Sequence, residues 1–175
     1  MNPRENESMS MGSEYLNNAI RIFQSVHKLG DQTLSQLTQE ELHWKPNTES
    51  NNVAVIVKHL HGNMVSRWTD LLTTDGEKSS RDRDGEFEGG YESRDALLEA
   101  WSTGWHKVFE TMASLTEDDL MKTITISNNP LTVIHSISRQ LQHYGYHVGQ
   151  IVFLGKQIKD GDWKQLSVAR APSKP

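Results

Sequence analysis

Apolar residues that recur every three or four positions are the feature that most constrains the fold of this chain. Four long segments have this spacing, which is typical of amphipathic helices with one buried face. The predicted helices cover approximately residues 13–36, 53–73, 94–115 and 130–159, and a short extended piece is expected at 123–126. Four helices of this length favour an all-α fold, most simply a four-helix bundle.

Polar residues indicate where several of these helical segments begin. Thr38 and Thr116 each stand three positions before an acidic residue, the pattern of a capping box that opens a short helical turn. Asn129 followed by Pro130 has the pattern of an N-cap and a first-position proline, so the last long helix is expected to begin there.

A weak internal repeat supports a two-part organisation. Residues 34–42 resemble residues 112–120, at an offset of 78 residues. Each half then holds a helix, a capped turn and a second helix. We therefore predict a four-helix bundle built from two pseudo-repeated helical hairpins. Its expected extent is residues 12–166, with a disordered arm at 1–11 and a flexible tail at 167–175.

Composition excludes several classes of protein. The 175 residues include no cysteine, which excludes disulfides, cysteine-ligated metals and a cysteine nucleophile. A net charge of −5 argues against a nucleic-acid partner, which needs concentrated Lys and Arg. No apolar run approaches the roughly 18 residues of a membrane span, and the first residues lack the apolar core of a secretory signal. We expect a cytoplasmic protein without a membrane partner.

Two histidines, His143 and His147, stand four positions apart in the last predicted helix. Residues with this spacing lie one above the other on a helix, with Cβ atoms about 5–6 Å apart. Both imidazoles can then reach one transition-metal ion, as in the His-x-x-x-His zinc motifs. Pairs of surface histidines have the same spacing, so a metal site requires a third ligand elsewhere in the chain.

The periodicity of the helices leaves the third ligand open. His61 falls inside the apolar stripe of the second predicted helix, whereas His59 lies more than about 90° from the centre of that stripe. His143 and His147 also lie off the stripe of their helix. In one interpretation His59, His143 and His147 face solvent and His61 packs in the core. In the other, both helices are buried on two faces, and the second face lines a metal cleft.

Residues 77–92 are rich in Asp, Glu, Arg and Gly. The segment from Asp82 to Gly85 partly matches a calcium-binding loop, but the later ligands of that motif are out of place. We expect a solvated loop over one end of the bundle.

The motifs of the second and fourth helices together resemble the DinB/YfiT-like superfamily of proposed metal-dependent enzymes, and a Bacillus-type subgroup of it. The matching stretches are residues 55–64, 66–70 and 73–78, and the late His-x-x-x-His that is followed by Gly149-Gln150. The resemblance covers about residues 12–166. It implies a four-helix bundle, commonly dimeric, in which three histidines hold a divalent metal ion. The family's ligand positions map to His59, His143 and His147, whereas His61 and His135 have no place in the pattern.

Three neutral imidazoles leave a coordination position open, as catalytic sites do. The expected metal is zinc or nickel, with iron or manganese as alternatives, and it would acidify a bound water or thiol. The resemblance implies a homodimeric enzyme acting on a small molecule, either as a low-molecular-weight-thiol S-transferase or as a hydrolase. The alternatives are a non-catalytic, stress-related dimeric bundle that binds a metal or small molecule, and a bundle with incidental histidines. Tyr144, Tyr146 and Gln150 are candidate donors that would orient the ligands.

Overall fold

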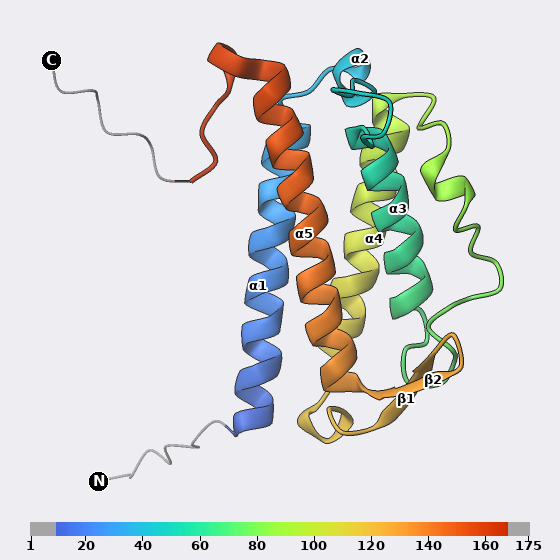
Figure 1. Cartoon of the computed structure of the whole chain (residues 1–175). Helices are drawn as coiled ribbons and strands as arrows, with labels where there is room; N and C mark the ends of the chain where they lie inside the picture. Colours follow the sequence, from blue (N-terminus) through green and yellow to red (C-terminus); the bar gives the residue numbers. More distant parts are fainter. Residues whose placement is uncertain (1–9, 168–175) are drawn as a thin grey trace, which may run out of the picture.

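The computed structural model describes residues 10–167, and in this part of the chain four long helices lie side by side (Figure 1). They are α1 (Met11–Leu34), α3 (Val53–Trp68), α4 (Arg94–Ser114) and α5 (Val133–Lys159). The shorter elements are α2 (Gln39–Leu42), the 3₁₀ turns η1 (Gly85–Phe87), η2 (Glu117–Asp119) and η3 (Asp160–Asp162), and an antiparallel ribbon of β1 (Thr123–Ile126) and β2 (Asn129–Thr132). The prediction of a mostly helical chain is confirmed.

The long helices are arranged differently from two packed hairpins. α1 packs chiefly on α5, and α3 chiefly on α4; the two helices of each pair point the same way (Figure 1). The helices of each predicted half instead face one another across the core. Phe23 of α1 meets Trp68 of α3 with ring centroids 5.7 Å apart, and Trp105 of α4 meets Tyr144 of α5 at 5.6 Å. Long connections that contain α2 or the ribbon allow these diagonal crossings, whereas short loops would join neighbouring helices.

The parallel direction of α3 and α4 decides the course of the segment between them. Because α4 begins at the same end of the molecule as α3, residues 69–93 must return along the length of α3 (Figure 1). We call this segment the crossover. The expected position of this loop over one end of the bundle is therefore wrong, because η1, within the crossover, packs against α3. Of residues 77–92, only Glu86 is buried.

Several helix boundaries agree with the capping signals. Thr38 forms a capping box with Glu41 at the start of α2, and Thr116 forms one around η2. α3 begins after the N-cap Asn52 but ends at Trp68, earlier than predicted. Asp70, with a φ of 50°, takes a left-handed conformation that stops the helix.

The start of α5 was predicted wrongly. Asn129 and Pro130 belong to β2, and α5 begins at Val133 with Thr132 as its N-cap. Ser127 and Asn128 have positive φ values of 52° and 60°, which suit a tight hairpin turn. Proline is tolerated in β2 because a two-stranded ribbon consists of edge strands.

The predicted N-terminal arm, residues 1–11, and the predicted C-terminal tail, residues 167–175, lie largely outside the described residues. Only Ser10 and Met11 of the predicted arm, and Ser167 of the predicted tail, belong to the described range, and Met11 is already the first residue of α1. Within that range, none of the helices combines the length and the apolar character that crossing a membrane requires.

Aromatic side chains and one polar network connect α3 to α5 in the core. The Trp68 indole donates to the Tyr144 hydroxyl at 2.8 Å, and that hydroxyl donates to Oδ1 of Asn63 at 3.1 Å. All three residues are buried, so the network satisfies polar atoms that water does not reach. Because His143 directly precedes Tyr144, the network also fixes the rotation of α5 that sets where His143 points.

Asp75 joins the crossover to the ribbon. Its carboxylate accepts hydrogen bonds from the backbone N–H of Glu77 at 2.7 Å, and from those of Ser127 and Asn128 at 2.8 Å each. These bonds, led by the one from Glu77, lower the pKa of Asp75 to about 2. The carboxylate stabilises both the start of the crossover and the hairpin turn.

We expect Asp75→Asn to destabilise the protein at neutral pH. We also expect the free energy of unfolding of this variant to depend less on pH in the acid range. The pKa of Asp75 is lower in the folded chain than its ordinary value of 3.8, so its stabilisation is complete above that value and is lost as pH falls toward 2. Urea unfolding at about pH 7 and about pH 3 measures the effect. Equal pH dependence of the free energy of unfolding in both proteins would contradict this role.

Candidate metal centre

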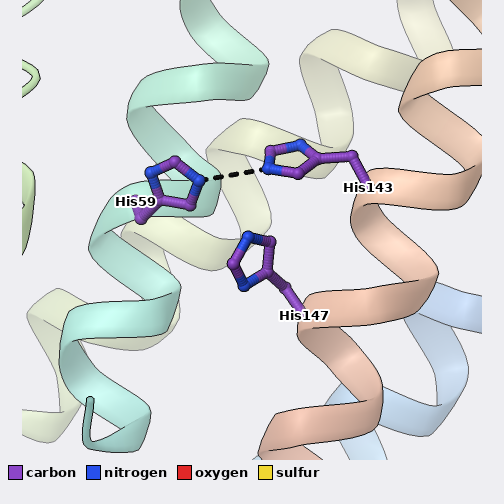
Figure 2. A group of neighbouring side chains, drawn as sticks. All are labelled: His59, His143 and His147. Atoms are coloured by element: carbon purple, nitrogen blue, oxygen red, sulfur yellow. Dashed lines mark hydrogen bonds between the residues drawn. The ribbon is translucent and has the colours of Figure 1, made fainter. Parts of the chain in front are cut away.

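Three imidazoles from two helices meet beside the core (Figure 2). His59 comes from α3, and His143 and His147 come from successive turns of α5. One ring nitrogen from each residue lies within 4.8 Å of the others, and within residues 10–167 no other group of three potential ligands is this close. The structure therefore brings together the three residues predicted as ligands, and leaves His61 and His135 outside the group.

Burial of α3 on two faces explains how His59 reaches this position. Leu60 and Met64 face the core with at most 1% of their surface exposed, and His59, on another face, is only 8% exposed. His143 and His147 are half-buried. The interpretation with solvent-facing histidines is therefore wrong for His59. α3 and α5 run in opposite directions side by side, which places His59 opposite the histidine pair (Figures 1 and 2).

Hydrogen bonds fix the tautomer of two of the three rings. Nδ1 of His59 lies 2.9 Å from Oε2 of Glu86, and Nδ1 of His147 lies 2.9 Å from Oε1 of Gln150. Both oxygens are acceptors, so both Nδ1 atoms donate a proton, and in the neutral form of each ring Nε2 carries the lone pair. A hydrogen bond of this kind orients histidine ligands in metal sites. Gln150 thus orients His147, but it does so as an acceptor and not as the predicted donor.

The electrostatic environment keeps the pair on α5 neutral. Burial, followed by the proximity of His147 and His59, lowers the pKa of His143 to about 3. Burial and the proximity of His59 also lower the pKa of His147. A neutral imidazole is the form that binds a metal ion. At neutral pH His143 and His147 are therefore uncharged, as metal binding requires.

The distances and the chemistry of the donors fit a divalent ion. Metal–nitrogen bonds of about 2.0–2.1 Å place two ligand nitrogens of a tetrahedral site roughly 3.3 Å apart. Nε2 of His59 and Nε2 of His143 are 3.1 Å apart. Imidazole nitrogen suits zinc, nickel, copper and iron, and three protein ligands leave room for a further one. The three histidines are therefore close enough to hold a metal ion. Imidazole donors alone do not determine which metal that is.

Glu86 is the partner of His59 that the sequence interpretation missed. It lies in η1 with 5% of its surface exposed, and it binds Arg81 as well as His59. Burial alone would raise the pKa of Glu86, but the hydrogen bonds from Arg81 and His59 outweigh burial and lower it. One signal was available in the sequence, the apolar Phe87 in an otherwise polar segment; its ring centroid lies 5.0 Å from that of His59.

The two tyrosines expected near the ligands take other roles. Tyr144 points into the core, where it binds Trp68 and Asn63. Tyr146 is 58% exposed, with its ring centroid 5.0 Å from that of His147.

A comparison with protein families identifies the domain. The family model described as "Protein of unknown function (DUF1572)" matches residues 10–172, nearly the whole chain. No curated protein and no solved structure matches the chain. Because the match covers well over half of the sequence, the chain belongs to the DUF1572 family.

Proposed function

We propose that His59, His143 and His147 bind one divalent metal ion and that the chain is a metal-dependent enzyme acting on a small molecule. One observation carries the proposal: the nitrogens of three half-buried or buried imidazoles converge, and two of these rings have their Nδ1 proton held by an oxygen acceptor. Zinc or nickel is the proposed metal, with iron or manganese as alternatives.

When bound, the ion would supply Lewis acidity that turns a water or a thiol into a nucleophile near neutral pH. The residues of the chain have simpler tasks. Glu86 and Gln150 hold the rings of His59 and His147, and the buried side of the cluster excludes water. Because the chain has no cysteine, any reacting sulfur must come from a cosubstrate. We therefore propose an S-transferase that uses a low-molecular-weight thiol, or a hydrolase.

A groove that shares Gln150 with the histidine cluster supports a small-molecule substrate. It has a volume of about 540 Å³, and Ile56 of α3 and Tyr146, Gln150 and Phe153 of α5 contribute to its walls. Gln150 lines the groove and also binds His147, so a molecule in the groove would lie beside the metal ligands. Tyr146 and Phe153 are more than half exposed, which leaves two aromatic rings free for contact.

The resemblance to the DinB/YfiT-like superfamily supports the same proposal, because its three ligand positions coincide with the histidines that converge here. As part of this proposal, the four long helices form a four-helix bundle with two pseudo-repeated halves. The protein works as a homodimer in the cytoplasm.

One observation favours a non-catalytic, stress-related binding protein as the second candidate. The carboxylate of Glu86 contacts the histidine cluster, and Arg81 and His59 already occupy both of its oxygens. It is therefore not free to act as a general base. In this case the metal would serve binding or sensing.

Metal content tests the site itself. Untagged protein should contain about one divalent ion per chain by elemental analysis. His59→Ala and His143→Ala should each weaken zinc binding by more than about tenfold, because each removes a direct ligand. His135→Ala is the matched control, since His135 is an exposed histidine of the same helix and lies outside the cluster. Unchanged metal uptake in His143→Ala would rule the site out.

Turnover separates the two candidate functions. Protein loaded with zinc or nickel is screened with low-molecular-weight thiols plus electrophilic acceptors, and with ester and amide substrates. We expect activity that disappears on chelation, returns when metal is restored and is lost in His143→Ala. Stoichiometric metal binding without turnover, and without thiol-dependent loss of substrate, would favour the non-catalytic candidate.

A further inference from the structure

The carboxylate of Glu86 accepts three side-chain hydrogen bonds. Arg81 donates from Nε to Oε1 at 2.6 Å and from Nη2 to Oε2 at 2.8 Å, and His59 donates from Nδ1 to Oε2 at 2.9 Å. The side chains of Glu86 and Arg81 are only 6% and 3% exposed, so water cannot replace these bonds. Only a carboxylate can accept all three, because an amide would turn its NH₂ group toward Arg81 or His59.

Gly62 makes the approach of this carboxylate possible. It lies one turn after His59 on α3, and therefore on the same side of the helix. A Cβ atom at position 62 would collide with Oε1 of Glu86 and lie 2.8 Å from its Cδ. Glycine is disfavoured inside a helix. Its presence at position 62 is explained by the Glu86 side chain, which packs directly against the helix there.

We propose that Gly62 and Glu86 are positioning residues of the metal centre: Gly62 leaves the space through which Glu86 reaches His59, and Glu86 fixes the ring so that its Nε2 faces the metal. This inference rests on the proposed binding of a metal by the three histidines. In this role both residues act through His59, and neither is a metal ligand.

The crossover therefore determines the geometry of a site to which it contributes no ligand. Lys58 donates from Nζ to the carbonyl of Glu88 at 3.0 Å, which holds the segment just after Glu86 against α3. Near its start, Ser66 donates to the carbonyl of Gly76 at 2.8 Å. These contacts fasten the crossover along α3 on both sides of Glu86.

The test compares zinc affinity, by competition with a chromophoric chelator, in the wild type, Gly62→Ala, Glu86→Gln and Gly145→Ala. We expect Gly62→Ala and Glu86→Gln to weaken binding by about 10- to 100-fold, the usual effect of losing a partner of a histidine ligand. Gly145→Ala is the matched control: it is the same substitution inside a long helix, and a Cβ there meets nothing within 4 Å. It should leave the affinity unchanged.

A double-mutant cycle tests whether Gly62 acts through Glu86. In a Glu86→Ala background the carboxylate that a new methyl group would displace is gone, so Gly62→Ala should have no further effect on affinity. Thermal unfolding of the metal-free proteins shows whether each variant is folded. An equal additional loss of affinity in the Glu86→Ala background would overturn the proposed role of Gly62.

NMR of the imidazole nitrogens gives a readout that does not require metal. We expect His59 of the metal-free wild type and of Gly145→Ala to carry its proton on Nδ1. Glu86→Gln and Gly62→Ala should show a mixture of tautomers or a shift to Nε2. Unchanged tautomers and wild-type zinc affinity in both variants would overturn this inference alone. Absence of metal from the wild type would instead overturn the proposed function on which it depends.

Discussion

The burial of α3 on two faces is the constraint from which the rest of the site follows. A polar ring on a helix that water does not reach needs a partner for each polar atom. His59 finds one partner in Glu86 and another in the histidine pair of α5. Glu86 in turn requires a buried cation, which Arg81 provides. The crossover thus covers the second buried face of α3. Its charged residues Glu86 and Arg81 pair with each other, and Glu86 also binds His59 on that face.

The histidines stand on two helices that the core holds in register. The hydrogen bonds from Trp68 to Tyr144 and from Tyr144 to Asn63 connect α3 to α5 next to His143. A satisfied buried network of this kind favours one arrangement of the helices over alternatives, because any shift would leave polar atoms unpaired. Ligands placed on such elements keep their geometry better than ligands placed on loops.

Local signals in the sequence predicted local structure well. Periodicity and capping residues located α1, α4 and the Thr38 turn, and helical spacing paired His143 with His147. These local signals failed where contacts between distant parts of the chain determine the structure. Asn129-Pro130 suits both a helix start and a hairpin, and only the strand pairing distinguishes the two. Periodicity could not choose between His59 and His61, because both faces of α3 are buried; His59 was identified from the resemblance. Glu86 was missed because charge alone does not reveal burial.

The order of the helices also has a consequence for the synthesis and folding of the protein. Within residues 10–167, the first and last long helices, α1 and α5, are neighbours, and His59 and His143 are separated by 84 positions in the chain. Contacts between such distant positions require the closure of a large loop, which slows folding. A chain emerging from the ribosome holds one of the three converging imidazoles until α5 has been made. Metal capture on the proposed site therefore requires that translation has passed His147 in α5.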